Sequence, residues 1–208
     1  MIQTADDLAL RGGLRTADVI RTIRDVSAAT GAPVLCMTYW NPVHAYGPGR
    51  FAAGLAAAGG AGCILVDLPV EEAGEWLRAA APHGLATVFL AAPSSTDGRL
   101  AEIAAASSGF VYAASLMGVT GTRETVGVEA AGLVSRVRAT TDLPVCVGVG
   151  VSDAAQAAEV AGFADGVIVG TAFVQRLLDA PGLAAGVDAV RDLARDLAEG
   201  LDRTVTTA

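Results

Sequence analysis

The sequence predicts an α/β protein built on parallel strands. Of its 208 residues, 52% are hydrophobic and only 17% are charged, which is typical of strands covered by apolar helices on both faces. Short apolar, β-branched runs alternate with segments of helical periodicity at a spacing of roughly 20–35 residues, the pattern of repeated strand–helix–strand units. We expect a single domain that spans residues 1–208.

Six runs are predicted to be strands, because each is short, apolar along its whole length and followed by turn residues. In chain order they are PVLCMT (33–38), GCILVD (62–67), ATVFLA (86–91), GFVYAA (109–114), LPVCVGV (143–149) and DGVIVG (165–170).

Helices are predicted before, between and after these strands. The first covers Thr16–Thr30, with Thr16 as its N-cap and Gly31 at its end. Pro42 is expected to bar a helix directly after the first strand. The remaining helices are expected over residues 50–58, 71–81, 97–106, 127–140, 153–161, 172–178 and 186–200.

Two architectures fit six strand–helix units, an open doubly wound sheet and a closed (β/α)8 barrel. A complete barrel of this kind, the TIM barrel, has eight strands and typically about 250 residues. If the six units belong to a barrel, the ring is therefore incomplete and lacks two strand–helix units.

Charge and residue usage argue against several kinds of chemistry. The net charge of −8 disfavours a nucleic-acid partner, and no apolar run reaches the length of a membrane span. All fourteen basic residues are Arg, so this sequence offers no lysine for a Schiff base or a Walker-type loop. His44 and His83 lack partners at ligand spacing, so no metal site is expected. Cys36, Cys63 and Cys146 lie in apolar runs, which predicts buried free thiols in a reducing cytoplasm.

Glycines at the ends of the last two predicted strands indicate a phosphate site. Gly150 ends one strand shortly before Asp153, the expected cap of the next helix, and Gly170 ends the following strand directly before Thr171 and a short helix. Glycine lets backbone amides approach an anion, and the helix start adds the positive end of its dipole. In barrels the last two strands commonly hold a phosphate. The alternative is a pair of ordinary tight turns in a glycine-rich chain.

The segment GFVYAASLMGVTGTRE (109–124) has an unusually long stretch of small residues after its strand, including Thr120 and Gly121. Such stretches are often binding loops or lids, although a plain connection is the alternative. Tyr112 in the preceding strand could offer its ring or hydroxyl to a ligand, or it could belong to the core.

Polar residues also follow the first two predicted strands. Tyr39 and Asn41 follow the first, and Asp67 ends the second. A carboxylate there is either catalytic or held by backbone amides, and we favour the second interpretation. Glu71 and Glu72 are expected to begin a helix and to complement its dipole.

Taken in order, MTYWNPV, VDLPVEE, SLMGVTGTR, GVGVSD and GVIVGTA resemble the tryptophan synthase alpha chain over residues 2–190. The resemblance implies a (β/α)8-barrel lyase of tryptophan biosynthesis that cleaves indole-3-glycerol phosphate to indole and glyceraldehyde 3-phosphate, without a metal or cofactor of its own. It implies that Asn41 and Pro69 face a beta subunit, which carries pyridoxal phosphate, in an alpha2beta2 assembly. The substrate-binding residues that it implies are Tyr39, Tyr112, Thr120, Gly121, Gly150, Gly170 and Thr171.

The resemblance also implies that the family's two catalytic carboxylates lie outside this sequence. In the family, a strand with a catalytic Glu and a DPxxDGPxIQ loop with a catalytic Asp come before the point matched by Met1-Ile2-Gln3. We therefore expect a start codon assigned too late and little activity from these 208 residues alone. The alternatives are a non-catalytic partner that modulates the beta subunit, and another phosphate-binding barrel enzyme such as a phosphoribosyl isomerase or thiamine phosphate synthase.

Overall fold

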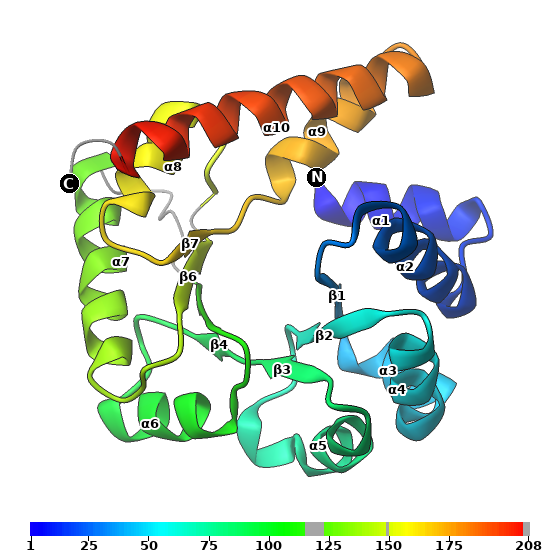
Figure 1. The fold of residues 1–208 in the computed structure, drawn as a ribbon, viewed down its shortest axis with the longest axis horizontal. Coiled ribbons are helices and arrows are strands. Elements are labelled where there is room, and N and C mark those ends of the chain that lie inside the picture. The colour runs from blue at the N-terminus through cyan, green and yellow to red at the C-terminus, as the bar shows by residue number, and fades with distance from the viewer. Residues whose placement is uncertain (115–122, 149, 206–208) are drawn as a thin grey trace.

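The computed structural model describes residues 1–114, 123–148 and 150–205. Its strands follow one another around a ring, and the helices lie on the outer side of that ring (Figure 1). In chain order the strands are β1 (Val34–Thr38), β2 (Gly60–Leu65), β3 (Ala86–Val88), β4 (Leu90–Ala91), β5 (Val111–Ala114), β6 (Val145–Gly148) and β7 (Gly166–Val167).

All strand pairs in the described part of the ring are parallel, and within each of its two sheets the strands pair in sequence order. The order is β1-β2-β3 in one sheet and β4-β5-β6-β7 in the other. Phe89 separates β3 from β4, so one run of chain pairs with β2 through its first half and with β5 through its second. The six predicted strands are thus confirmed, with the third divided in two.

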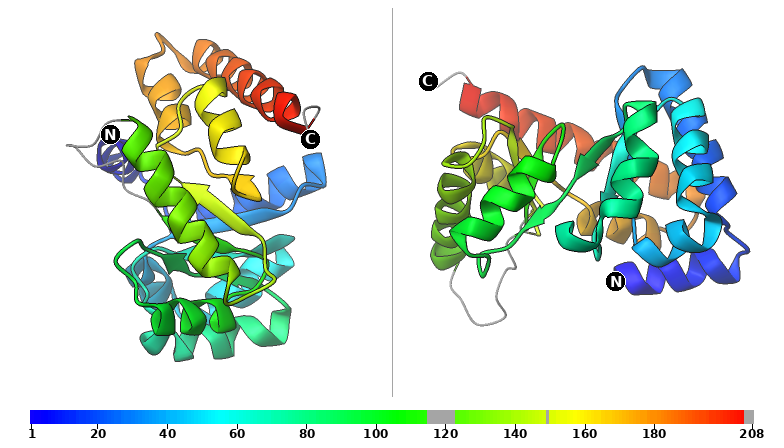
Figure 2. Two further views of the ribbon diagram at one scale, coloured as in Figure 1. Left: turned by 90° about the vertical axis from the view of Figure 1, so that its left-hand side faces the viewer. Right: turned by 90° about the horizontal axis from the view of Figure 1, so that it is seen from below.

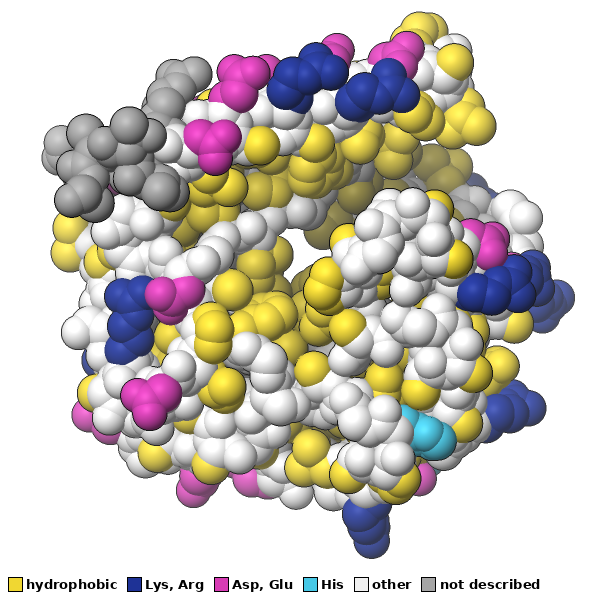
Figure 3. Space-filling model, in the orientation of Figure 1, with side chains coloured by type: hydrophobic (Ala, Val, Ile, Leu, Met, Phe, Trp, Pro, Cys, Tyr) yellow, Lys and Arg dark blue, Asp and Glu magenta, His cyan; other side chains and the backbone are white. Residues whose placement is uncertain are grey.

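The ring is open between β1 and β7. Within residues 1–114, 123–148 and 150–205, no strand pairs with the outer edge of either one. Side chains that face inward beside the opening are accessible to solvent: Met37 of β1 is 53% exposed, whereas Cys36, which faces the helices, is 4% exposed. Figure 3 shows hydrophobic side chains around the central hollow. The predicted barrel-type fold with six strand positions is confirmed.

The helices cover the outer face of the ring, and α10 packs along α8 and α9 (Figures 1 and 2). None of the described helices is long and apolar enough to cross a membrane. Those from the first half of the chain are α1 (Ile2–Arg11), α2 (Thr16–Thr30), α3 (Trp40–Tyr46), α4 (Pro48–Ala57), η1 (Val70–Glu72), α5 (Gly74–Ala80), η2 (Ala81–His83) and α6 (Asp97–Ala106). They are followed by α7 (Arg123–Arg138), α8 (Ala154–Ala161), α9 (Thr171–Asp179) and α10 (Leu183–Val205).

One prediction about the segment after the first strand was wrong. Pro42 does not bar a helix, because it is the third residue of α3 and the amides of the first helical turn have no intrahelical acceptor to lose. At the start of the chain, α1 begins at Ile2, where the resemblance places the end of a loop.

Two predicted helix starts also differ in the structure. Thr16 is the first residue of α2 rather than its cap; Arg15 precedes the helix, and its amide donates to Asp18 Oδ2 at 2.8 Å. Glu71 and Glu72 lie in the 3₁₀ turn η1, so the predicted helix 71–81 is a series of three short helices.

The core lies between the outer faces of the strands and the helices. Trp76 of α5 is completely buried and donates its indole N–H to Thr87 Oγ1 at 3.2 Å. Along β5 and β6, buried residues alternate with half-buried ones. The prediction that every strand is buried on both faces is therefore wrong for these two, because their inner faces line the open ring.

The three cysteines are free thiols, as predicted. Cys36 and Cys63 lie opposite each other on β1 and β2 and are buried beneath the helices. Cys146 faces the ring and is only half-buried. The prediction of burial thus holds for two of the three.

Candidate functional site

The turn that follows β6 is shaped by a glycine and by local side-chain bonds. Gly150 has a φ of +72°, in the left-handed region that favours glycine. Asp153 then caps α8, with Oδ1 accepting from the Gln156 amide at 2.9 Å. Gln156 Oε1 in turn accepts from the Ser152 amide at 2.7 Å and from its hydroxyl at 3.0 Å. The predicted cap at Asp153 is confirmed, and the turn has a defined backbone geometry.

Tyr112 lies inside the ring and leans over the tip of β6. A Cβ built on Gly148 would stand 2.3 Å from the Tyr112 Oη and 2.7 Å from its Cζ, far inside van der Waals contact. The ring therefore occupies the space that a side chain at position 148 would need. Burial raises the pKa of the Tyr112 phenol, so the hydroxyl is protonated near neutral pH and can donate a hydrogen bond.

The tip of β7 leads into the start of α9. Gly170 precedes the helix, and its carbonyl accepts from the amides of Phe173 at 3.0 Å and Val174 at 3.2 Å. The amides of Thr171 and Ala172, in the first turn, have no acceptor within the helix and carry the positive end of its dipole. No atom of the described residues lies within 4 Å of a Cβ built on Gly170, so these residues leave the space before this helix start open.

The two turns lie at the same edge of the sheet. Cys146 and Val147 of β6 pair in parallel with Gly166 and Val167 of β7, and the carboxyl ends of parallel neighbours project in the same direction. Ile168 continues the pairing by donating its amide to the Val147 carbonyl at 2.8 Å. Backbone amides at two neighbouring strand tips are an arrangement suited to binding an anion.

Asp67 follows β2 and supports the start of α3. Its Oδ1 accepts a 2.7 Å hydrogen bond from the Trp40 amide, the first helical residue. This contact agrees with the interpretation of Asp67 as a carboxylate held by a backbone amide. Tyr39, directly before α3, is 53% exposed, and Asn41 in its first turn is also exposed. Asp67 thus holds the backbone at Trp40, the residue between these two predicted site residues.

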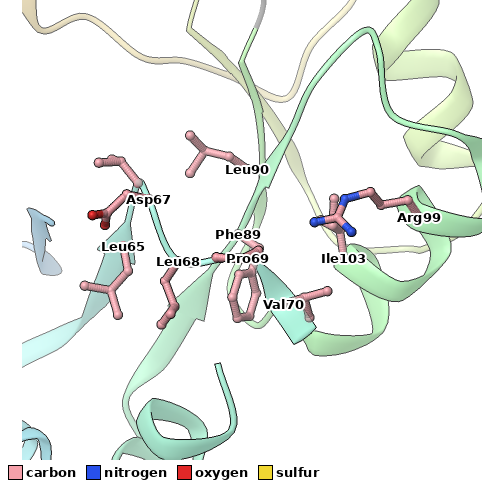
Figure 4. Close-up of a pocket in the computed structure, with 10 residues that line it drawn as sticks. Leu65, Asp67, Leu68, Pro69, Val70, Phe89, Leu90, Arg99 and Ile103 are labelled. Atoms are coloured by element: carbon pink, nitrogen blue, oxygen red, sulfur yellow. The ribbon is translucent and has the colours of Figure 1, made fainter. Parts of the chain in front are cut away.

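A cavity of about 210 Å³ lies between the β2–η1 connection and α6. In Figure 4, Arg99 extends from α6 on one side of this cavity, and Asp67 lies on the other. Arg99 Nη2 bonds to Glu71 Oε2 at 3.0 Å, and this hydrogen bond lowers the pKa of the Glu71 carboxyl. Pro69, predicted to face a partner, lines the cavity and is half-buried. No sequence signal pointed to Arg99, because its partner is 28 positions away.

The remaining site predictions fall elsewhere. Thr120 and Gly121 lie outside the described residues. Among the residues that are described, no cluster of His, Cys, Asp and Glu could hold a metal ion. The structure therefore groups Tyr112, Gly150, Gly170 and Thr171 around the tips of the last strands, while Tyr39, Asn41 and Pro69 follow the first two.

Parallel strands around an open ring, with outer helices and glycine turns at the last two strand tips, define a barrel-type α/β protein with a candidate anion site. A family model described as "Tryptophan synthase alpha chain" matches residues 1–201. The chain belongs to the tryptophan synthase alpha chain family.

Similar proteins agree with this membership and confirm the resemblance. The alpha chain of Streptomyces coelicolor is 70% identical over 201 residues, which cover 97% of this chain and 74% of the relative. The Thermobifida fusca alpha chain is 56% identical over 204 residues, with 97% and 75% covered.

Solved structures agree as well. A crystal structure of tryptophan synthase from M. tuberculosis, in its ligand-free form, is 46% identical with a TM-score of 0.86, covering 96% of this chain and 74% of that one. The alpha subunit from Legionella pneumophila is 32% identical with a TM-score of 0.85, covering 97% and 75%.

Proposed function

We propose that this chain binds indole-3-glycerol phosphate and takes part in its cleavage to indole and glyceraldehyde 3-phosphate, a lyase reaction of tryptophan biosynthesis. The observation that carries the proposal is the pair of amide-rich turns on neighbouring strands β6 and β7, the second opening α9. Membership of the tryptophan synthase alpha chain family supports the choice of substrate.

The two ends of the substrate would bind to different parts of the ring. The phosphate would accept hydrogen bonds from the amides near Gly150 and from the amide and hydroxyl of Thr171, in the open space before Gly170. The indole would lie against Tyr112 and Leu90, which are paired side by side on β5 and β4 and are both half-buried. Thr120 and Gly121 belong to the proposal through the family resemblance alone.

The reaction needs two proton transfers. The bond between the indole ring and the glycerol chain breaks with its electron pair going to the ring, which takes up a proton, while a glycerol hydroxyl loses a proton as the aldehyde forms. Both steps call for a positioned acid or base. Asp67 stands at a strand end, but its Oδ1 is bonded to the Trp40 amide. We therefore propose that the 208 residues alone bind the substrate but cleave it slowly.

The partner proposed for this chain is a tryptophan synthase beta subunit in an alpha2beta2 assembly, with pyridoxal phosphate on the beta subunit. Asn41 is exposed and Pro69 partly exposed, and both follow the carboxyl ends of strands, the end that also carries the glycine turns. Indole released inside the ring would leave toward a partner seated there. Free thiols at all three cysteines are consistent with the cytoplasm as the compartment.

Calorimetric titration with indole-3-glycerol phosphate tests the binding step. Gly170→Val would fill the open space before α9 and should weaken binding by about tenfold or more, without unfolding the protein. Gly182→Val is the matched control, because a Cβ at Gly182 also meets nothing within 4 Å but stands at the other end of α9. Equal affinities for both variants would refute the phosphate site.

An indole-release assay tests the chemical step. We expect near-background release from the chain alone. Stimulation of a beta subunit without any indole release would favour a second candidate function, that of a non-catalytic modulator of the beta subunit. Two observations favour this candidate: Asn41 is exposed, and Asp67 Oδ1 is engaged by the Trp40 amide. Rapid indole release by the chain alone would contradict the proposal that these residues bind the substrate but cleave it slowly.

A further inference from the structure

Two of the three cysteines form a pair that the proposed function does not use. Cys36 of β1 and Cys63 of β2 stand opposite each other in the parallel register of these two strands. Residues opposite each other on parallel strands point to the same face of a sheet. Both side chains are buried on the face that the helices cover. The two thiols therefore share one protected space.

The spacing of the two strands suits a covalent bond between these sulfurs. Neighbouring strands lie about 4.7–4.9 Å apart, which is within the roughly 4.4–6.8 Å that usually separates the Cα atoms of a disulfide. The thiols of Cys36 and Cys63 already form a hydrogen bond with each other, so their side chains point toward one another. A disulfide can form here while both strands keep their register.

The same hydrogen bond gives the two sulfurs different reactivity. The Cys63 thiol donates to the Cys36 sulfur, which lowers the pKa of the Cys36 thiol. This hydrogen bond and burial raise the pKa of the Cys63 thiol. Because the thiolate is the nucleophile in thiol chemistry, Cys36 is the sulfur that reacts first with an oxidant.

Cys146 differs from this pair in position and reactivity. It lies on β6, in the other sheet, and faces the interior of the ring. Burial and the nearby Asp165 carboxylate raise the pKa of its thiol, so little thiolate forms near neutral pH. Cys146 therefore serves as an internal control for the chemistry of the other two.

We propose that Cys36 and Cys63 are a site of reversible oxidation, which hydrogen peroxide converts into a disulfide between β1 and β2. The Cys36 thiolate attacks one peroxide oxygen and the O–O bond breaks; the hydroxide that leaves takes up the proton released by Cys36 and becomes water. The Cys63 thiol then attacks the sulfenic acid on Cys36, so that the S–S bond forms, the S–O bond breaks and a second water leaves. The two thiols together lose two electrons, and the peroxide is reduced to two waters.

The disulfide would close a loop that contains α3 and α4. It would tie the strand that precedes Asn41 to the strand that precedes Asp67. In a reducing compartment, exchange with a small thiol returns the pair to its free form. This site uses no residue of the phosphate site, so it does not depend on the proposed function.

Peptide mapping of the folded chain after peroxide treatment tests the proposal. Remaining thiols are alkylated, and trypsin then cleaves after Arg24, Arg50 and Arg78, which places Cys36 and Cys63 in separate peptides, 25–50 and 51–78. Mass spectrometry should show these two peptides joined by a bond that dithiothreitol breaks. The peptide that contains Cys146 should carry the alkyl group.

Two variants and an unfolded sample are the controls. Cys146→Ser should form the same joined peptides, whereas Cys63→Ala should form none and should leave Cys36 as a sulfenic acid or a higher oxide. Oxidation of the chain unfolded in urea should also link Cys146 to the other cysteines, because the folded register no longer selects the pair.

Two outcomes would overturn the proposal. One is the absence of joined peptides 25–50 and 51–78 from the folded, unaltered chain. The other is the same mixture of links in the folded and the unfolded samples. Both outcomes are read from the unaltered chain, so they hold even if a variant at a buried cysteine fails to fold.

Discussion

The ring of Tyr112 occupies the space that a side chain at Gly148 would fill, with its Oη 2.3 Å from the position of a Cβ there. Tyr112 comes from the middle of β5 and Gly148 from the end of β6, the neighbouring strand. Small size at one strand tip thus lets an aromatic ring from the next strand reach the mouth of the barrel. This contact places an apolar wall beside the turn that presents Gly150.

Gly148→Ala should destabilise the protein by about 1–3 kcal/mol, because the added methyl group forces Tyr112 from its position. Urea unfolding of this variant, of Tyr112→Ala and of the double variant completes a double-mutant cycle. Gly148→Ala should lower the free energy of unfolding much less in the Tyr112→Ala background than in the unaltered chain. An equal cost in both backgrounds would show that the ring does not lie over Gly148.

Gly150→Ala should lower the free energy of unfolding by about 1–2 kcal/mol, because its φ of +72° is strained for an L-residue. Gly170→Ala serves as the control, since its φ of −128° is ordinary and its Cβ would meet nothing within 4 Å. Chemical denaturation measures both. Equal stabilities of the two variants would count against the left-handed turn at Gly150.

Asp67→Ala should destabilise the protein by about 1 kcal/mol, as expected for the loss of a carboxylate that accepts from the first amide of a helix. Hydrogen exchange should show faster opening of the Trp40 amide in this variant. Glu72→Gln, a change at an exposed carboxylate nearby, is the control. Unchanged stability of Asp67→Ala, with the Trp40 amide exchanging as slowly as in the unaltered chain, would contradict this role of Asp67.

The hydrogen bonds of the Asp165 carboxylate predict that the protein loses stability in acid. The Val145 amide, which donates to its Oδ2 at 2.8 Å, and the Arg138 guanidinium hold the pKa of the Asp165 carboxyl below its ordinary value. A carboxyl whose folded pKa is lowered stabilises the protein fully above its unfolded pKa of about 3.9 and loses that effect as the pH falls through the folded value.

The measurement for this prediction compares Asp165→Asn with the unaltered chain between neutral pH and acid. The unaltered chain should be more stable near pH 7, and the difference should shrink below about pH 4. A difference that stays constant over this range would contradict the assignment, because it would show that the charge on Asp165 is not responsible.

Much of the fold follows from local patterns. The six apolar runs became strands, and the helices Thr16–Thr30 and Asp97–Ala106 cover the residues that periodicity predicted, although Arg15 rather than Thr16 precedes the first of them. The helix α3 was missed because proline usually disrupts a helix. Pro42 lies in the first turn of α3, where its missing N–H costs no intrahelical hydrogen bond. Strands and helices that follow from local residue patterns were therefore predicted correctly. The helix α3 was not, because a proline in the first turn of a helix is an exception to the usual pattern.

The site was predictable only in part. The glycine turns after β6 and β7 could be predicted, because Gly150 and Gly170 stand at the ends of predicted strands. The bond between Asp67 and Trp40 joins residues 27 positions apart, and the contact between Tyr112 and Gly148 depends on the register of two strands. Both arise only when the ring forms, so no local signal could reveal them.

The most direct test of the central claim is a titration of the isotopically labelled chain with indole-3-glycerol phosphate, followed through its backbone amide NMR signals. The amides of Gly150, Gly170 and Thr171 should shift together and saturate, and indole-3-glycerol without the phosphate should leave them unchanged. Shifts that gather instead around the cavity beside Arg99, with these three amides unmoved, would contradict the claim.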